Sequence, residues 1–457
     1  MSRICLVSLP LMDYAVFSSS HEKIMPSIGL AYLATVAKSL GHDVLLLDAE
    51  FRKLPIENLA AAIVDWRPDI VGISIPSPLL AVAKRLVHRL STLRLGATLI
   101  VGGVHPTIVR EEIFSEIPAI DIAFIKEAET SFREYLQGAP LDSIAGIIFR
   151  GTDGNLVATG DPSPTDIDKL PFIDRDLVEN DPWESNGKCE SYVCSSRGCP
   201  FKCTFCSGGL LQGKAIRQRS IENVILEISY LAEKYGVNYI HFVDDNFIIS
   251  RSRAIEFCNA IAHTGLKVGW RFLARASVLH QLHDHEFHML RAAGCELIGI
   301  GVESGSPRIC ELIKKDINLE WVSDIVRKAT ESGIATKGFF IVGFPFEEES
   351  DLALTRKFIL ESGLTDINIS LLRAFPGTEL YDELLKTHSA PDLAEYLQHT
   401  GLFSASEYSH ERIKKAELYM MSHFVNLNPF FSIEELAQII TDIYRQFYSR
   451  RGTLAQP

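Results

Sequence analysis

The chain has 457 residues, of which 47% are hydrophobic and 23% are charged. This composition indicates a globular protein of two or three domains and excludes a disordered or fibrous chain. The formal charge of -13, from 45 basic and 58 acidic residues, would repel phosphate backbones, so we expect no nucleic-acid partner. Nine cysteines are too few for a disulfide scaffold. No stretch approaches the roughly 20 apolar residues of a membrane span, so we expect a cytoplasmic protein without one.

Residues 1–140 alternate short apolar runs with helical periods, which predicts strands and helices in turn. Strands that are apolar throughout, such as 70–75, suit a parallel sheet covered on both faces. We therefore expect a doubly wound sheet of about five strands, with its ligand beyond the strand carboxyl ends. The expected strands are 4–8, 44–48, 70–75, 99–101 and 120–125, and the expected helices are 28–40, 56–66, 80–93 and 129–137.

Residues 141–187 predict a hairpin followed by an interdomain linker. One more apolar strand, 145–151, is followed by the turn-forming residues 152–155 and then by a stretch in which prolines recur.

A second βα series begins near residue 188 and continues to 388. About six βα units predict a (β/α)6 partial TIM barrel, whose working face is formed by the strand carboxyl ends. The last segment, 389–457, has helical periods and no convincing strand, so we expect a small helical C-terminal region. The expected strands are 239–243, 268–274, 296–302, 338–342 and 366–371, and the clearest helices are 221–235 and 253–263.

Three cysteines, Cys199, Cys203 and Cys206, lie in a glycine-bearing loop after the first barrel strand, with the spacing C-x3-C-x2-C. Thiolates this close in sequence can converge on one polynuclear metal centre, and glycines let backbone amides approach inorganic sulfur. A zinc site would more naturally show two C-x-x-C pairs or added histidines. Cys189 and Cys194 fit no four-ligand pattern. Three ligands on a four-iron cluster would leave one iron open for substrate or cosubstrate.

This loop resembles the signature of the radical S-adenosylmethionine (SAM) enzymes, in which an aromatic residue, here Phe205, precedes the last cysteine. In that family SAM chelates the open iron, and the reduced cluster cleaves it to methionine and a 5'-deoxyadenosyl radical. The resemblance implies that Cys199, Cys203 and Cys206 bind a [4Fe-4S] cluster and that Phe205 lies against adenine. It also implies an electron donor such as flavodoxin or ferredoxin.

Later strand ends resemble the family's SAM contacts. Asp244 and Asp245 end the second strand, where the family binds the methionine ammonium group; the alternative is a helix cap at Asp245 or Asn246. Arg275 ends the third strand as a candidate for the SAM carboxylate, with a surface salt bridge as the alternative. The remaining contacts that the resemblance implies are Glu303 and Ser304 for ribose and methionine, and the backbone of Val342 for adenine.

The N-terminal domain resembles the flavodoxin-like cobalamin-binding domain of the cobalamin-dependent branch of this family. Small or hydroxylated residues at the strand ends would let the nucleotide tail and corrin approach the backbone. The alternative is a generic doubly wound domain with another ligand or none. The candidate cobalamin contacts are Ser74, Ser77, Gly102, Gly103 and His105.

Two features depart from cobalamin-binding relatives. The D-x-H-x-x-G motif, which supplies a histidine to cobalt, is absent, so cobalamin is expected to bind without that ligand; His21 is more simply a solvated loop residue. Lys126 occupies a position where relatives usually have glycine, which weakens the match at the edge of the pocket.

The resemblance implies a cobalamin-dependent methyltransferase that acts on an unactivated carbon of a small biosynthetic intermediate after hydrogen abstraction. In this scheme one SAM remethylates cobalamin and another supplies the radical. A non-methylating enzyme of the same branch (ring contraction, cyclisation or oxidation) and a cobalamin sensor or carrier are the alternatives. Tyr408 and the aromatic run from Phe424 to Phe431 are candidates for lining the substrate site, with packing the simpler role for the run.

Overall fold

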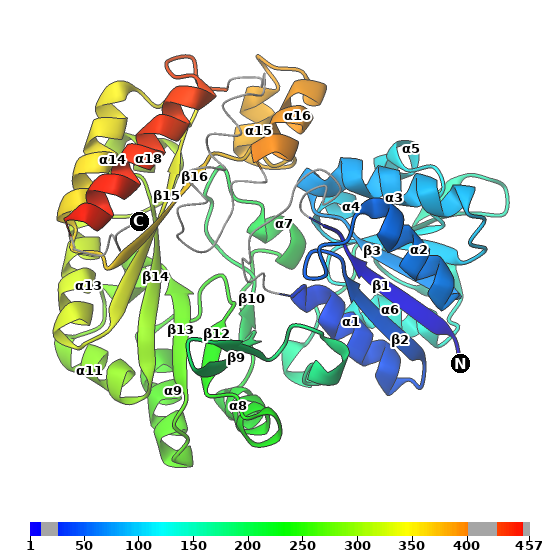
Figure 1. The fold of residues 1–457 in the computed structure, drawn as a ribbon, viewed down its shortest axis with the longest axis horizontal. Coiled ribbons are helices and arrows are strands. Elements are labelled where there is room, and N and C mark those ends of the chain that lie inside the picture. The colour runs from blue at the N-terminus through cyan, green and yellow to red at the C-terminus, as the bar shows by residue number, and fades with distance from the viewer. Residues whose placement is uncertain (11–25, 401–426, 451–457) are drawn as a thin grey trace. The chain divides into compact units, whose positions relative to one another are not determined.

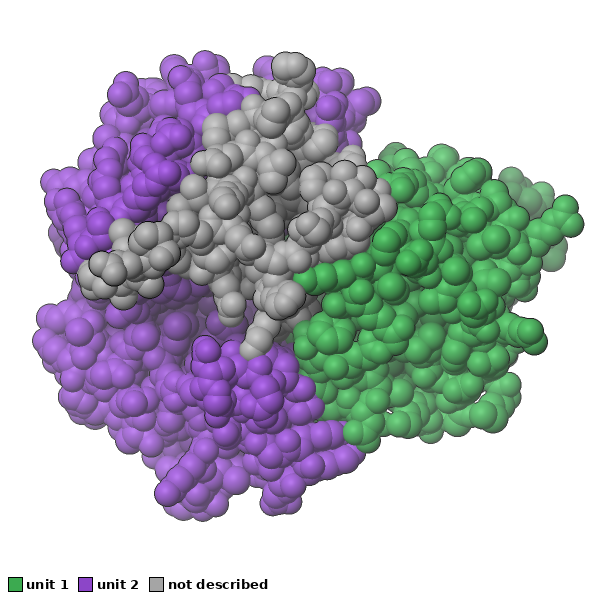
Figure 2. Space-filling model, in the orientation of Figure 1, with its two compact units in different colours: residues 1–181, 207–215, 375–377 green, residues 182–206, 216–374, 378–457 purple. Residues whose placement is uncertain are grey.

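The computed structural model describes residues 1–10, 26–400 and 427–450, with the backbone alone for 396–400. The chain forms two compact units (Figures 1 and 2). Unit 1 comprises residues 1–181, 207–215 and 375–377, and unit 2 comprises residues 182–206, 216–374 and 378–457.

Unit 1 is built around a seven-stranded sheet. Its strands are β1 (Arg3–Ser8), β2 (Asp43–Asp48), β3 (Ile70–Ser74), β4 (Thr98–Gly102), β5 (Ile122–Phe124), β6 (Ile147–Arg150) and β7 (Leu156–Ala158). The strand order is β2-β1-β3-β4-β5-β6-β7, and the first five strands are parallel. The doubly wound sheet is therefore confirmed. The hairpin β6–β7 continues this sheet in antiparallel pairing.

The helices of unit 1 are α1 (Ile28–Ser39), α2 (Ile56–Trp66), α3 (Leu80–Thr92), α4 (Val104–Val109), α5 (Ile113–Glu116), α6 (Glu129–Leu136) and α7 (Gly208–Gln212). The sequence did not predict α4 and α5, because each spans fewer than two turns and shows no readable period. Gly72 in β3 permits close packing, since a Cβ there would lie 2.7 Å from the Leu6 side chain.

Unit 2 contains a second seven-stranded sheet. Its strands are β8 (Trp183–Ser185), β9 (Lys188–Val193), β12 (Tyr239–Phe242), β13 (Gly269–Ala274), β14 (Cys295–Glu303), β15 (Ala335–Val342) and β16 (Asp366–Leu371). The order is β16-β15-β14-β13-β12-β9-β8, with six parallel strands and β8 antiparallel at one edge. Because β16 pairs only with β15, the sheet curls without closing, and the partial barrel is confirmed (Figure 1).

The helices of unit 2 are α8 (Ile221–Tyr235), α9 (Arg251–Thr264), α10 (Ala276–Leu279), α11 (Asp284–Ala292), α12 (Pro307–Leu312), α13 (Leu319–Glu331), α14 (Glu349–Glu361), α15 (Glu379–Leu384), α16 (Ala390–Thr400) and α18 (Ile433–Ser449). A short ribbon pairs β10 (Ser196–Arg197) with β11 (Arg217–Gln218). Among the described helices, none is both long and apolar enough to cross a membrane.

The two faces of the half-barrel strands differ, as the two-residue period of a strand allows. One face carries fully buried apolar residues such as Ile240, Trp270 and Ile298, which pack with the surrounding helices. The other carries His241, Arg271 and Leu273, of which Leu273 is 40% exposed. Packing on the apolar face thus holds the strands in place. The side chains of the opposite face and of the strand ends are therefore available to form a site.

Candidate functional site

The three predicted cluster cysteines lie in the loop that follows β9. All three carry reduced thiols outside any disulfide; Cys199 and Cys203 are partly buried, and Cys206 is exposed. Cys206 N–H donates to the Cys203 carbonyl at 3.2 Å, which closes a turn around the C-x2-C pair. The amide and the carbonyl of Thr204 form hydrogen bonds of 3.0 and 2.9 Å to the backbone outside the loop, so the loop is held from within unit 2.

Two of these sulfur atoms accept hydrogen bonds from side chains. Arg275 Nη1 donates to Cys203 Sγ at 3.5 Å, and Asn246 Nδ2 donates to Cys199 Sγ at 3.8 Å. The Arg275 guanidinium also lies 3.6 Å from the centre of the Phe201 ring. Burial raises the pKa of the Cys199 thiol in the absence of a metal. N–H groups directed at sulfur suit cysteines that act as thiolate ligands, since such hydrogen bonds stabilise the added negative charge.

The donor set fits an iron–sulfur cluster better than a single metal ion. Within residues 1–10, 26–400 and 427–450, no three His, Cys, Asp or Glu side chains converge as ligands of one ion. A cluster needs no such convergence, because each thiolate binds a different iron.

Asp244 and Asp245, which follow β12, have different surroundings. Asp244 is 1% exposed, and its carboxyl accepts hydrogen bonds from the Ser195 amide (3.0 Å), the Ser195 hydroxyl (2.8 Å) and the Ser196 hydroxyl (2.5 Å). Asp245 is exposed. Burial raises the pKa of the Asp244 carboxyl. Asp244 therefore fastens the start of the cysteine loop to β12, whereas the Asp245 carboxyl is accessible to a ligand.

Glu303 ends β14 in a strained conformation. Its φ of +69° is left-handed, and the strand register shifts between Gly301 and Glu303. The buried carboxylate accepts a hydrogen bond from Lys315 Nζ at 2.6 Å. A Cβ on Gly301 would lie 2.7 Å from Glu303 Oε1 and 2.9 Å from Lys315 Nζ, so the glycine makes room for this pair. Strain at a buried, paired carboxylate is typical of a functional site.

Arg275, the candidate for the SAM carboxylate, is largely committed to protein contacts. It is 7% exposed, and Nη2 donates to the Lys315 carbonyl while Nη1 faces Cys203. Arg275 forms no surface salt bridge, the alternative role, with any residue of the described parts of the chain.

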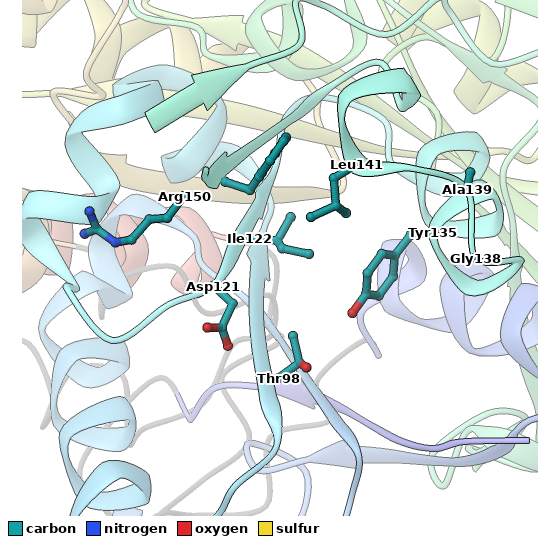
Figure 3. Close-up of a pocket in the computed structure, with 9 residues that line it drawn as sticks. Thr98, Asp121, Ile122, Tyr135, Gly138, Ala139, Leu141 and Arg150 are labelled. Atoms are coloured by element: carbon teal, nitrogen blue, oxygen red, sulfur yellow. The ribbon is translucent and has the colours of Figure 1, made fainter. Parts of the chain in front are cut away.

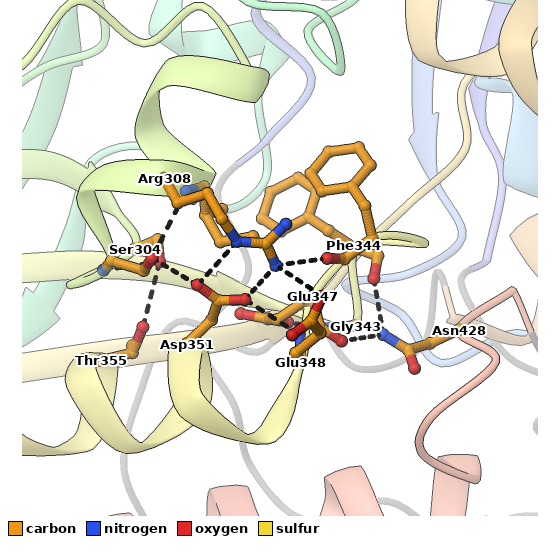
Figure 4. Close-up of polar contacts among 12 residues, drawn as sticks. Ser304, Arg308, Gly343, Phe344, Glu347, Glu348, Asp351, Thr355 and Asn428 are labelled. Atoms are coloured by element: carbon orange, nitrogen blue, oxygen red, sulfur yellow. Dashed lines mark hydrogen bonds and ion pairs between the residues drawn. The ribbon is translucent and has the colours of Figure 1, made fainter.

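Of the residues expected around adenine and ribose, Ser304 follows β14 and Val342 ends β15, whereas Phe205 lies in the cysteine loop. The rings of Phe205 and Phe344 meet edge to face at 6.0 Å. Val342 is fully buried, and its carbonyl accepts a hydrogen bond from Leu372 N–H at 2.8 Å. The Ser304 hydroxyl lies 3.0 Å from Thr355 Oγ1, so it is engaged inside the protein (Figure 4).

The five candidate cobalamin contacts gather at one edge of the unit 1 sheet. Ser74 and Gly102 are paired last residues of β3 and β4. Gly103 has φ +100°, and a Cβ there would lie 3.1 Å from Ser74 Oγ. His105 is 4% exposed, and its ring nitrogens face Ser77 Oγ (3.2 Å) and Glu116 Oε2 (2.8 Å). His105 thus supports the loop at Ser77 and presents no unbound nitrogen in this arrangement.

Lys126 has φ +61°, a left-handed conformation that glycine adopts without strain. Here its amide donates to Thr107 Oγ1 at 2.8 Å, and its ammonium pairs with Asp161. These two contacts stabilise Lys126 in the left-handed conformation. His21 lies outside the described residues.

Sequence reasoning missed Lys315, Asn246 and Ser195. A buried glutamate needs a positively charged partner, so the sequence indicated that Glu303 has one. Nothing in the sequence showed that this partner is Lys315. For the predicted substrate site, Tyr408 and Phe424 lie outside the described residues. Phe430 is 56% exposed, and Phe431 packs against the core of unit 2.

Unit 1 also has an open surface cavity of about 490 Å³ (Figure 3). It lies at the opposite edge of the sheet from Gly102, since Thr98 begins β4 and Ile122 begins β5. Tyr135, Asp121 and Arg150 also line it, and it contains none of the predicted site residues.

Two family models match the chain. The B12 binding domain matches residues 15–136, and the radical SAM superfamily matches residues 193–359.

Curated relatives extend over most of the chain. An uncharacterized methyltransferase of Pyrococcus horikoshii is 32% identical over 363 residues, which cover 78% of each protein. The anaerobic magnesium-protoporphyrin IX monomethyl ester cyclase of Rubrivivax gelatinosus is 27% identical and is matched over 79% of this chain and 66% of its own length. The cytidylyl-2-hydroxyethylphosphonate methyltransferase of Streptomyces wedmorensis is 25% identical, covering 94% of this chain and 87% of its own.

Solved structures share the fold. The radical SAM methyltransferase TsrM from Kitasatospora setae, with cobalamin and a [4Fe-4S] cluster bound, has a TM-score of 0.67 at 18% identity, covering 86% of this chain and 77% of its own. The cobalamin-dependent SAM radical enzyme OxsB, with aqua-cobalamin bound, has a TM-score of 0.65 at 20% identity, covering 92% and 61%. The chain belongs to the cobalamin-dependent radical SAM enzymes, whose cofactors are a [4Fe-4S] cluster, SAM and cobalamin.

Proposed function

We propose that this enzyme is a methyltransferase that transfers a methyl group from SAM, through cobalamin, to an unactivated carbon of a small biosynthetic intermediate. Relatives named as methyltransferases in Pyrococcus horikoshii and Streptomyces wedmorensis support this proposal. The observation that carries it is the loop of Cys199, Cys203 and Cys206, three reduced thiols with N–H groups directed at two of them.

In this proposal the three cysteines bind the cluster, and the ends of the neighbouring strands bind SAM. Asp245 pairs with the methionine ammonium group, because its carboxyl is exposed where that of Asp244 is not. Lys315 holds the buried Glu303 carboxylate by an ion pair and orients it toward the ligand. When bound, these cofactors supply a radical that removes hydrogen from the substrate and a methyl group that replaces it.

The chain's own part in the reaction is binding and orientation. Phe205 and Phe344 offer apolar ring surface for adenine, and Arg275 holds Cys203 by a charged hydrogen bond. In unit 1, Ser74, Ser77, Gly102, Gly103 and His105 are the proposed cobalamin contacts.

The test is an anaerobic assay of the reconstituted, cobalamin-loaded chain with SAM labelled in its methyl group. We expect the label to leave SAM and to appear in cobalamin and in a product when candidate intermediates are supplied. A Cys203→Ala variant, which loses one cluster ligand, should cleave no SAM. If the loaded wild type cleaves SAM and transfers no labelled methyl group to any acceptor, the methyltransferase proposal is wrong.

The second candidate is a non-methylating enzyme of the same family. The similarity of this chain to the cyclase of Rubrivivax gelatinosus favours it. For such an enzyme, deuterium from a labelled substrate would enter 5'-deoxyadenosine while the methyl label stayed in methionine. The same assay therefore distinguishes the two candidates. Flavodoxin or ferredoxin is the proposed electron donor for either one.

A further inference from the structure

The turn after β15, residues 343–348, carries the residues that the proposed function assigns to the adenine side of SAM. It begins at Gly343, whose φ is +89°, and continues through Phe344, whose ring meets that of Phe205. Inside the turn, Glu347 Oε2 accepts a hydrogen bond from Gly343 N–H at 2.6 Å. The backbone path of this turn therefore decides where the aromatic surface lies.

Asn428 ties this turn to the C-terminal segment (Figure 4). Its amide Nδ2 donates to the Phe344 carbonyl at 2.6 Å and to the Glu347 carbonyl at 2.9 Å. Its Oδ1 accepts from the backbone N–H groups of Phe430 (2.7 Å) and Phe431 (3.0 Å). The side chain is 2% exposed, and these four hydrogen bonds use both donors and both acceptor sites of the amide.

The helix that follows, α18, contacts the same turn. A Cβ placed on Gly343 would lie 3.0 Å from Leu436 Cδ1. The helix begins with its own capping box, in which Ser432 Oγ accepts from Glu435 N–H at 3.1 Å. The contacts that start α18 and the contacts that hold the turn are thus made by different atoms.

We propose that Asn428 is a positioning residue for SAM: through its two Nδ2 hydrogen bonds it fixes the turn at Phe344 and Glu347 on which adenine is bound. This proposal rests on the proposed function, which places adenine beside Phe205 and Phe344. It adds that the C-terminal segment, more than 80 residues away in sequence, sets the affinity for SAM.

The Asn428→Asp variant separates the two halves of the side chain. One carboxylate oxygen still accepts from Phe430 and Phe431, whereas the other replaces the donor and faces two carbonyl oxygens. We expect SAM to bind at least tenfold more weakly, about 1.4 kcal/mol. Iron and sulfide content and cobalamin binding should equal those of the wild type.

Binding is measured on the reconstituted full chain by equilibrium dialysis of labelled SAM, and by the change that SAM produces in the EPR spectrum of the reduced cluster. Steady-state SAM cleavage gives a second measurement. KM for SAM should rise about tenfold, while kcat at saturating SAM stays within about twofold.

The matched control is Ser432→Ala, which removes the cap of α18 but retains both Nδ2 hydrogen bonds. Substitutions of this kind destabilise the start of a helix, so the control reproduces a loss of helix stability. The proposal is overturned if Asn428→Asp and Ser432→Ala bind SAM with equal affinity, whether that affinity equals the wild-type value or is lower. A wild type that binds and cleaves SAM but transfers no methyl group overturns the methyltransferase function alone, because the effect of Asn428→Asp on SAM affinity is measured without methyl transfer.

Discussion

Asp244 and Asp245 are neighbours in sequence, yet only one of them has an exposed carboxyl. Asp244 is enclosed by the hydrogen bonds of Ser195 and Ser196, and Asp245 faces solvent. The sequence marked both as candidates for the same ammonium group, because a strand end with two carboxylates does not reveal which one turns inward. Their variants should therefore separate folding from SAM binding.

We expect Asp244→Asn to lower the free energy of unfolding by about 2 kcal/mol, because an amide cannot accept all the hydrogen bonds that the buried carboxyl receives. Asp245→Asn should change it by less than about 0.5 kcal/mol, as exposed substitutions usually do, but should weaken SAM binding. Urea unfolding and dialysis of labelled SAM measure the two effects. An Asp245→Asn variant with wild-type SAM affinity would contradict the proposed ammonium contact.

Glu347 predicts a pH dependence of stability. Its carboxyl is fully buried, and burial raises its pKa to about 7, with hydrogen bonds from the Gly343 and Phe344 amides opposing the rise. Because the folded pKa lies above the unfolded value of 4.5, the contribution is complete below about pH 4.5 and is lost as the pH rises through about 7. The loss amounts to roughly 3 kcal/mol.

The measurement compares wild type with Glu347→Gln by urea unfolding between pH 5 and 8. Three of the four tryptophans, Trp183, Trp270 and Trp321, lie in unit 2, so tryptophan fluorescence reports mainly on the unit that contains Glu347. The wild type should lose stability relative to the variant as the pH increases. A constant difference across this range would show that Glu347 does not titrate there.

At the scale of elements, helix α18 covers the open edge of the half-barrel. The sheet ends at β16, so the outward N–H groups of this strand need partners. The Tyr444 hydroxyl accepts the Ile369 N–H at 2.8 Å, and the Tyr448 hydroxyl donates to Asp366. β16 is thereby joined to α18 at its first residue, Asp366, and at Ile369 further along the strand; α18 lies beside α14 and β16 in Figure 1. The helical period predicted a C-terminal helix, but only the sheet order shows which edge it covers.

Tyr444→Phe should lower the free energy of unfolding by about 1–3 kcal/mol, because it leaves the buried Ile369 N–H without a partner. The matched control is Gln438→Ala on the exposed face of the same helix, where we expect a change within about 0.5 kcal/mol. Equal stabilities of the two variants in urea would argue against this role of the hydroxyl.

At the scale of the whole molecule, the proposed cofactor contacts are divided between the two units. The three cysteines belong to unit 2, and the five candidate cobalamin contacts belong to unit 1. Each unit has its own sheet and its own apolar core. The loss of one cofactor should therefore leave the binding of the other unchanged.

The variant in which Cys199, Cys203 and Cys206 are all replaced by alanine tests this independence. We expect it to contain no cluster iron and to cleave no SAM, because a cluster needs its thiolate ligands. Cobalamin should bind with an affinity within about twofold of the wild type, as measured by absorbance. Loss of cobalamin together with iron would indicate that the two sites depend on each other.

The sequence by itself determined the features that are local in the chain. The βα alternation follows from the 2-residue and 3.6-residue apolar periods, and the candidate cluster ligands follow from three cysteines within one loop. The strand ends and the glycine turns are also local features that the sequence predicts. These features predicted both sheets and the family, including the pairing of a cobalamin domain with a radical SAM barrel.

Only the tertiary structure decided how distant side chains pair. Ser195 reaches Asp244 across 49 residues, and Asn428 reaches Phe344 across 84. Such contacts depend on which strand ends lie side by side, and no local period encodes that order. For the same reason, Lys315 was missed as the partner of Glu303, and Arg275 was expected to face a ligand although it holds Cys203. The dependence of the turn that supports Phe205 on the C-terminal segment is a third contact of this kind.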